Sequence, residues 1–378
     1  MKQNNGKKVL FSATVYLHLA AFHKPFMKML QRNGFEVHAA ANPHFGRKDE
    51  IEELGVKCWD IPFSRSPYTK HNWKAYKELK SLFEENYFDL IHVHTPVASF
   101  LVRYLAKRNK QGPVLYTAHG FHFFKGAPLT NWLLYYSAER IASRWTDGLI
   151  VMNNEDYSNG IKMGFIPNET LFSTRGVGID IESYSYKEKS EIRKELNIPE
   201  DHIVITCVAE LCSRKNQLYL LEAWKELSTM HKHIHLLLVG DGGMETELTE
   251  FANNKGLRNV HFAGYRTGIP SIISSSDIMT LVSKQEGLPR CIMEAMACSK
   301  PSVVTNVRGS RDLVEHGVTG YVVELDDKEQ LVQSFHALIQ DKEKRIQMGQ
   351  AAFEKIQGYA LQNVSGQLDS IYRKYVTQ

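Results

Sequence analysis

The chain has 378 residues, a length that predicts two domains at roughly 150 residues per domain. Hydrophobic residues make up 43% and charged residues 23% of the chain, a balance that is typical of globular proteins and excludes wholesale disorder. The net charge of only +4 argues against nucleic acid as a partner.

Short apolar runs alternate with longer segments of helical periodicity through the first half of the chain. The runs that predict strands are 9–13, 35–40, 90–94, 114–118 and 149–152. The segments that predict helices are 25–32, 72–84, 98–107 and 131–144. Such alternation predicts a doubly wound parallel sheet, and the nearly continuous apolar character of the strands indicates that helices cover both of its faces.

A second series of the same kind follows the glycine-rich segment 176–180. Its predicted strands are 203–208, 235–239, 260–262, 278–281, 302–304 and 320–323. Its predicted helices are 217–230, 244–253, 292–298 and 328–338, and a last helical pattern covers 360–375. The fold class is therefore α/β, with Rossmann-like domains at 1–180 and 181–358 and a C-terminal helix in 359–378 that packs back on the first domain. In such sheets ligands bind beyond the carboxyl ends of the strands.

Cysteine content and charge distribution give expectations about location. The five cysteines include no CxxC pair, which argues against a disulfide framework and a structural zinc site. We find no apolar signal segment and no run near the roughly 20 apolar residues of a membrane helix, so we expect a cytoplasmic protein.

Residues 1–180 carry 23 basic and 16 acidic side chains (+7), against 23 and 26 (−3) for residues 181–378. A basic first half favours peripheral contact with the anionic inner membrane face or a phosphorylated acceptor; a scattered, solvated surface is the alternative.

The segment 283–297, after a predicted strand, is the richest in residues that could carry chemistry. Pro289 suits a first helical turn and Gly287 leaves the backbone open before it, so the free N–H groups there favour phosphate. Glu286 and Glu294 are poor phosphate ligands, but their carboxylates can accept hydrogen bonds from sugar and ribose hydroxyls. Alternatively, Glu286 faces solvent and Glu294 forms a surface salt bridge, and the spacing alone does not decide between these readings.

Glu286 and Glu294 match an E-x7-E signature, and the residues around them resemble the retaining glycosyltransferases of family four, which have the GT-B fold. The resemblance continues through the C-terminal half in the family's order, at the motifs 239–242, 262–264, 276–278 and 317–320. The N-terminal half is similar in composition to the branch of the family that builds bacterial exopolysaccharide or capsule.

The resemblance implies roles on the donor side. In this family the first glutamate contacts the donor sugar and the second the nucleotide ribose, which implies these roles for Glu286 and Glu294. The backbone N–H groups of Gly287 and Leu288 would meet the diphosphate. Lys215 matches the family lysine that neutralises the diphosphate.

One departure from the family concerns the second basic residue. Where most members have Gly-Arg, this chain has Ala209-Glu210, so a carboxylate replaces the arginine. An acidic side chain beside a diphosphate is repulsive unless it points away. Arg214 either supplies the second charge or is an exposed arginine at a helix start.

Histidines mark the candidate site in the first half. His119 lies in a segment that resembles the one carrying the family's active-site histidine, which implies contact with the donor sugar. His92 and His94 share one face of a predicted strand, but two histidines without a third ligand are weak evidence for a metal, so a role for His94 at the cleft edge is preferred. The family's paired glycines after the first strand are absent. Tyr16 and His18 in this loop are acceptor-side candidates by position alone, and residues of loop or helix packing are the alternative.

The family resemblance also implies the reaction and its partners. It implies transfer with retention of configuration from a nucleotide-sugar, most simply a UDP-sugar, with no further cofactor. The sequence has no Asp-x-Asp pair for a metal, so no metal is expected. The implied acceptor is a glycan or a lipid-diphosphate-linked sugar. One alternative is another GT-B enzyme, such as an epimerase or a pyridoxal-phosphate-dependent phosphorylase. The other is a catalytically inactive nucleotide-sugar-binding partner of a polysaccharide assembly complex, which Glu210 favours.

Overall fold

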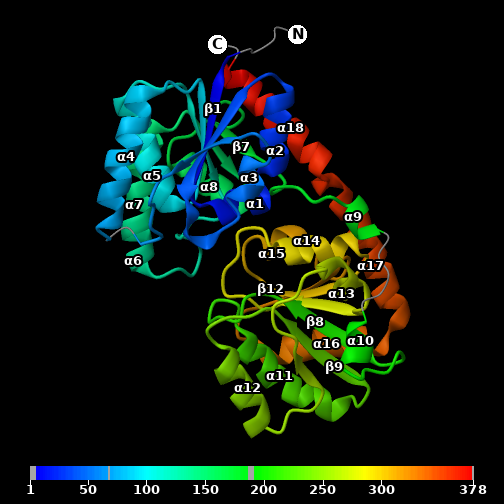
Figure 1. Ribbon diagram of the computed structural model, residues 1–378. Helices are drawn as coiled ribbons and strands as arrows, with labels where there is room; N and C mark the ends of the chain where they lie inside the picture. Colours follow the sequence, from blue (N-terminus) through cyan, green and yellow to red (C-terminus); the bar gives the residue numbers. More distant parts are fainter. Residues whose placement is uncertain (1–5, 67–68, 186–190, 377–378) are drawn as a thin grey trace. The chain divides into compact units, whose positions relative to one another are not determined.

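The computed structural model describes residues 6–66, 69–185 and 191–376. The chain divides into two compact units (Figure 1). The first runs to Gly178 and takes up the chain again from Gln362, and the second is Ile179–Leu361. Each unit contains one parallel β-sheet, which confirms the predicted fold class. Among the described residues, we find no helix long and apolar enough to cross a membrane.

In the first unit, seven strands lie in the order β3-β2-β1-β4-β5-β6-β7 with parallel pairing throughout. They are β1 (Lys8–Val15), β2 (Glu36–Asn42), β3 (Lys57–Asp60), β4 (Leu90–His94), β5 (Val114–Ala118), β6 (Gly148–Val151) and β7 (Leu171–Ser173). All residues of β4, β5 and β6 are buried, as expected for strands covered on both faces.

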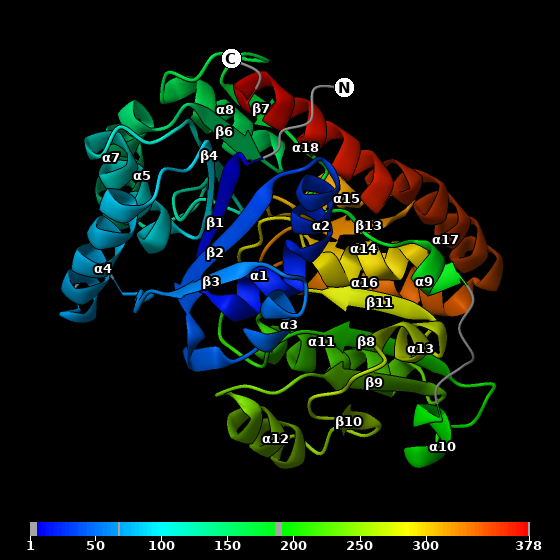
Figure 2. The same ribbon diagram turned by 45° about the horizontal axis from the view of Figure 1, so that its top comes forward.

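Helices cover both faces of this sheet. Figures 1 and 2 show α4, α5 and α7 on one side and α1, α2 and α18 on the other. The helices are α1 (Tyr16–Phe22), α2 (Lys24–Arg32), α3 (Asp49–Glu52), α4 (His71–Glu85), α5 (Pro96–Arg108), α6 (Leu129–Asn131), α7 (Ser137–Ala142), α8 (Asn154–Lys162) and α18 (Leu361–Val376). Three short helical turns are η1 (Pro43–Phe45), η2 (Trp132–Tyr136) and η3 (Ser143–Trp145). The C-terminal helix α18 is fixed to the unit by Tyr372, whose hydroxyl lies 2.7 Å from His92 Nδ1.

The second unit contains six strands in the order β10-β9-β8-β11-β12-β13, again all parallel. They are β8 (Ile203–Val208), β9 (Ile234–Val239), β10 (Val260–Phe262), β11 (Ile278–Leu281), β12 (Ser302–Thr305) and β13 (Gly320–Val323). Figure 2 shows β11, β8, β9 and β10 side by side. The helices are α9 (Glu182–Ser185), α10 (Ile192–Glu195), α11 (Gln217–Met230), α12 (Glu245–Asn254), α13 (Ile269–Ser274), α14 (Arg290–Ala297), α15 (Ser310–Leu313), α16 (Lys328–Gln340) and α17 (Lys342–Ile356), followed by the turn η4 (Gln357–Tyr359).

Three local predictions differ from the structure. The edge strands β3 and β7 were not predicted, because β3 is mixed in polarity and β7 has only three residues. The expected loop after the first strand is wrong, since α1 begins at Tyr16, directly after β1 ends at Val15. The helix expected at 131–144 is interrupted by the π-helical turn η2 between α6 and α7.

Candidate active site

In the second unit, the loops after two adjacent strands bring a lysine and a glutamate together. Lys215 lies in the loop between β8 and α11, and Glu286 in the loop between β11 and α14. Because β8 pairs with β11, the two loops leave neighbouring carboxyl ends of the sheet. Lys215 Nζ lies 2.6 Å from Glu286 Oε1, with side-chain exposures of 12% and 8%. Glu286 therefore does not face solvent, and its carboxylate forms a largely buried ion pair.

Two arginines add positive charge around Glu286. Arg214 Nη1 lies 3.5 Å from Glu286 Oε1 and donates to the backbone oxygen of Gln285 at 3.3 Å. Arg308, between β12 and α15, is only 2% exposed, and its Nε donates to the backbone oxygen of Glu286 at 3.0 Å. Sequence reasoning missed Arg308, although a basic residue three positions after a buried strand was a usable signal. Two cations thus lie at the Glu286 carboxylate, and a third holds the backbone of the same residue.

The second glutamate of the signature is held by a different pair of donors. Glu294, on α14 and 9% exposed, accepts from the Tyr184 hydroxyl at 2.8 Å and from Arg290 Nε at 3.0 Å. Its ion pair with Arg290 was the alternative weighed for this residue, but the carboxylate is nearly buried rather than on the surface. Burial, then the negative charge of Glu294, raises the pKa of Tyr184 above its ordinary value. Tyr184 is a second residue that the sequence did not single out.

The loop between the two glutamates is tightly packed. Helix α14 begins at Arg290, so the expectation that Pro289 lies in its first turn is wrong; Pro289 is the N-cap with an extended backbone (φ −71°, ψ 114°). Gly309 has a φ of +76°, and a Cβ there would lie 2.2 Å from the backbone oxygen of Gly287. Glycine at 309 therefore lets the loop after β12 approach the loop after β11 at Gly287 and Leu288.

The departure at Glu210 has little direct consequence for the ion pair. The Glu210 side chain is exposed, whereas Lys215 and Glu286 are nearly buried. Its backbone oxygen accepts from Gln217 Nε2 at 2.8 Å, which ties the loop to the start of α11. Gly240 packs against the same loop, because a Cβ there would lie 2.2 Å from the backbone oxygen of Ala209.

In the first unit, the structure brings His18, His94 and His119 together. His18 Nε2 lies 3.3 Å from His119 Nε2, which in turn lies 3.3 Å from His94 Nδ1. Burial lowers the pKa of His94 and of His119 well below the usual range, and burial together with the Arg65 charge lowers that of His18 to about 4. These imidazoles are therefore neutral at physiological pH.

Two other predicted residues lie inside the unit. Tyr16 is fully buried and its hydroxyl donates to the backbone oxygen of Trp59 at 2.8 Å, so it belongs to the packing of α1. His92 uses both ring nitrogens, at 2.7 Å from Tyr372 and 2.7 Å from Thr117, and has a structural role.

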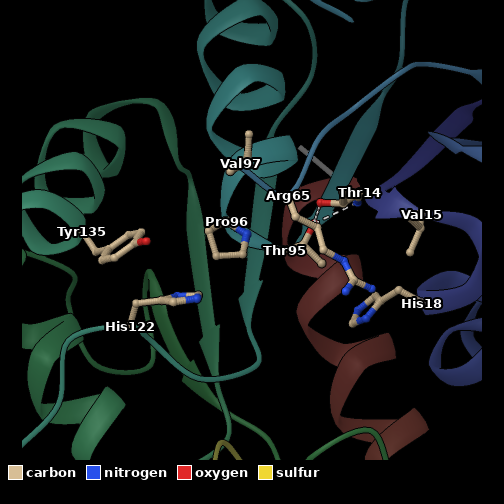
Figure 3. Close-up of a pocket in the computed structure, with 9 residues that line it drawn as sticks. All are labelled: Thr14, Val15, His18, Arg65, Thr95, Pro96, Val97, His122 and Tyr135. Carbon is tan, nitrogen blue, oxygen red and sulfur yellow. Dashed lines mark hydrogen bonds between the residues drawn. The ribbon is translucent and has the colours of Figure 1, made fainter. Parts of the chain in front are cut away.

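A pocket of about 330 Å³ lies beside His18 (Figure 3). Its polar lining includes His18, His122 and Arg65, with the Arg65 guanidinium close to the His18 ring in Figure 3. A second pocket of about 340 Å³ has a mostly apolar lining and shares Pro96, Val97 and Tyr135 with the first. A pocket with one charged and several polar side chains thus adjoins a pocket with a mostly apolar lining.

Comparison with known proteins shows the family of the chain. The model of the family "Glycosyl transferases group 1" matches residues 188–355, and that of "Glycosyl transferase 4-like" matches residues 8–153. The glycosyltransferase EpsD of Bacillus subtilis (strain 168) is 33% identical, covering 98% of this chain and 97% of that protein. The Escherichia coli UDP-Gal:alpha-D-GlcNAc-diphosphoundecaprenol alpha-1,3-galactosyltransferase is 27% identical, over 92% of this chain and 91% of that protein.

Among solved structures, Anabaena Alr3699/HepE in complex with UDP and glucose has the same fold, with a TM-score of 0.79, 21% identity, and coverage of 97% of this chain and 100% of that one. Both halves of the chain thus match glycosyltransferase models, and a relative that matches nearly the whole length is named as a glycosyltransferase. The chain belongs to the group 1 glycosyltransferases of family four, which have the GT-B fold.

Proposed function

We propose that the protein transfers a sugar, with retention of configuration, from a UDP-sugar to a lipid-diphosphate-linked glycan during bacterial exopolysaccharide or capsule synthesis. The observation that carries the proposal is the nearly buried Lys215–Glu286 pair at the carboxyl ends of two adjacent strands. The names of the relatives support the substrates, since one acts on UDP-Gal and a diphosphoundecaprenol-linked sugar.

On the donor side, the chain's own cations neutralise the diphosphate. Lys215 and Arg214 lie at the Glu286 carboxylate and Arg308 holds the backbone of the same residue, so three positive charges are available to a departing diphosphate. Preorganised charges of this kind stabilise a leaving group without a metal ion. Transfer is therefore expected not to require a divalent cation.

The carboxylates orient the donor. The Glu286 carboxylate accepts hydrogen bonds from hydroxyls of the donor sugar. The Glu294 carboxylate, which Tyr184 and Arg290 hold in position, accepts a hydrogen bond from a ribose hydroxyl. The family resemblance assigns His119 a contact with the donor sugar. These roles come from the family pattern. They fit the two carboxylates, because hydrogen-bond donors of the protein already hold them in position.

The paired pockets of the first unit fit an amphiphilic acceptor. Arg65 and His122 in the pocket beside His18 can bind a diphosphate. The adjoining apolar pocket, with Phe100 and Leu134, can bind the first part of a lipid chain. Three leucines near it are exposed: Leu129 by 80%, Leu133 by 74% and Leu134 by 45%. We therefore place the protein peripherally at the cytoplasmic face of the membrane, with this segment toward the lipid.

Calorimetric titration with UDP and with a panel of UDP-sugars, in chelator and in magnesium, tests the donor side. Binding that is independent of metal and tighter for one UDP-sugar is the expected result. Transfer is then measured with that sugar on a synthetic lipid-diphosphate-linked acceptor, and the anomeric configuration of the product is read by NMR. Binding of UDP-sugar without transfer to any acceptor would instead support a non-catalytic partner of an assembly complex.

A further inference from the structure

Four histidines of the first unit gather around one point. His18 lies on α1 and His23 is its C-cap, His94 ends β4, and His119 follows β5. One ring nitrogen of each lies within 4.8 Å of those of the other three. In the part of the chain that the structure describes, this is the one group of three or more histidine, cysteine or acidic side chains with its ligand atoms gathered in this way.

Three of the distances between these nitrogens equal the edge of a tetrahedral metal site. His18 Nε2 lies 3.3 Å from His119 Nε2 and 3.4 Å from His23 Nε2, and His119 Nε2 lies 3.3 Å from His94 Nδ1. Zinc binds histidine nitrogens at about 2.0–2.1 Å, so two ligands of a regular tetrahedron lie about 3.3–3.4 Å apart. Neighbouring ligands of a square-planar ion would lie only about 2.8–3.0 Å apart.

Hydrogen bonds alone do not explain the cluster. A ring nitrogen of neutral imidazole offers either one proton or one lone pair. Here His18 Nε2 and His119 Nε2 each face two other nitrogens, so the three contacts cannot all be good hydrogen bonds. The distances also exceed the usual 2.7–3.2 Å, roughly, of an N–H donor bond.

The second unit provides an internal comparison. There four histidines form a chain in which successive nitrogens lie 2.9 Å apart: His233, His202, His235 and His261. Each nitrogen in that chain meets one other nitrogen at ordinary hydrogen-bond distance. Histidines that are merely hydrogen-bonded therefore look different in this protein from the four around His18.

The inner ligands are buried. His94 is 0% and His23 is 2% exposed, and His94 Nε2 and His23 Nδ1 have no hydrogen-bond partner. The rings of His23 and His94 stack with centroids 3.7 Å apart and planes 24° apart, so the two ring planes do not meet at one nearby ion. For all four nitrogens to point at one ion, the His23 ring must turn, and no hydrogen bond at Nδ1 opposes that rotation.

The cluster can be reached from solvent. His18 lines the pocket of about 330 Å³ shown in Figure 3, beside Thr14 and Thr95. A metal ion can therefore enter past His18, while His23 and His94 close the inner side.

We propose that His18, His23, His94 and His119 form a binding site for one tetrahedral transition-metal ion of the Zn²⁺ type. Histidine nitrogens suit zinc better than calcium or magnesium, which prefer oxygen ligands. The site lies entirely within the first unit and is distinct from the diphosphate-binding residues of the second. It goes beyond the proposed transfer reaction and does not rest on it.

Zinc content of the full chain tests the proposal. The purified protein is stripped with a chelator, loaded with Zn²⁺ alone and desalted, and bound metal is measured by elemental analysis. The variants are His23→Ala and His18→Ala, and His202→Ala is the matched control, since it removes one histidine from the hydrogen-bonded chain. Cobalt loading adds a geometric readout, because tetrahedral Co²⁺ absorbs visible light far more strongly than octahedral Co²⁺.

We expect one retained zinc per chain and a tetrahedral cobalt spectrum in the wild type and in His202→Ala. In His23→Ala and His18→Ala, zinc affinity should fall by at least about tenfold. Zinc should raise the Tm of the wild type and the control more than that of the ligand variants. Thermal unfolding of the metal-free variants shows whether they are folded; if His23→Ala is not, the partly exposed His18→Ala decides. A wild type that retains no zinc, or folded ligand variants that retain as much as the wild type, would overturn the proposal.

Discussion

The Lys215–Glu286 ion pair predicts opposite effects of two neutralising substitutions on UDP affinity. In the described structure the Glu286 carboxylate lies 2.6 Å from Lys215 Nζ and so offsets the charge that a diphosphate needs. Lys215→Met removes that charge, whereas Glu286→Gln removes the competing carboxylate and leaves the lysine in place. Both side chains are nearly buried, so the effect is only weakly screened by salt.

The size of each effect follows from the geometry. A phosphate about 4 Å from Lys215 gains about 4 kcal/mol at an effective dielectric constant of about 20. Hydrogen bonds to charged groups contribute about 1.5–3 kcal/mol net, so Lys215→Met should weaken UDP binding by about 10- to 150-fold. A carboxylate about 8 Å from the diphosphate repels it by about 2 kcal/mol before screening, so Glu286→Gln should leave UDP affinity between unchanged and about tenfold tighter. The same variant should lose nearly all transfer activity.

Calorimetric titration with UDP at fixed ionic strength measures both variants. Glu315→Gln is the matched control, because this carboxylate is 60% exposed and 3.9 Å from Lys355. Lys215→Met leaves the nearly buried Glu286 carboxylate with only the partly exposed Arg214 at 3.5 Å, which can lower folding stability. The double variant Lys215→Met/Glu286→Gln removes that carboxylate as well, so a loss of UDP affinity that persists in it is a loss of binding. If Glu286→Gln weakens UDP as much as Lys215→Met does, the carboxylate binds the nucleotide and our reasoning about the pair is refuted.

Three further predictions concern residues around the site. Tyr184→Phe removes the hydroxyl that donates to Glu294 at 2.8 Å and should weaken UDP roughly tenfold in calorimetry, while an unchanged affinity would contradict a positioning role. Gly309→Ala places a Cβ 2.2 Å from a backbone oxygen and should lower both Tm and UDP affinity. Gly317→Ala is its control, because Gly317 also has a positive φ (+79°) but open space around its Cβ position. Equal losses in the two variants would exclude a packing role for Gly309. Arg65→Ala should raise the KM for a lipid-diphosphate acceptor severalfold without changing UDP affinity, and a loss confined to UDP would place Arg65 on the donor side.

The sequence predicted the sheets well because both units are doubly wound. Buried parallel strands such as β5 and β8 are short apolar runs, and their predicted bounds coincide with those observed. The edge strands β3 and β7 lack this pattern, since one of their sides has no neighbouring strand and burial is incomplete. Sequence periodicity reports burial, so it predicts the centre of a sheet better than its edges.

The candidate site was predictable where one short motif carries it. Glu286 and Glu294 lie within a single loop and helix, and Lys215 follows a strand that the pattern identifies. Arg308 and Tyr184 were missed because each reaches the site from a distant part of the chain. Only the strand order and the loop packing bring such residues to the glutamates.

The histidine cluster shows the same limit and links the two proposals. His92 and His94 offered too few ligands in the sequence, and the fold supplies the others from α1 and from the loop after β5. His119 belongs to both proposals, and its Nε2 already faces His18 and His94. One lone pair cannot bind a metal ion and accept a sugar hydroxyl together. We therefore expect stoichiometric zinc to inhibit transfer and a chelator to restore it, without any change in UDP affinity. Transfer unaffected in protein shown to hold one zinc would mean that His119 does not contact the donor sugar through Nε2.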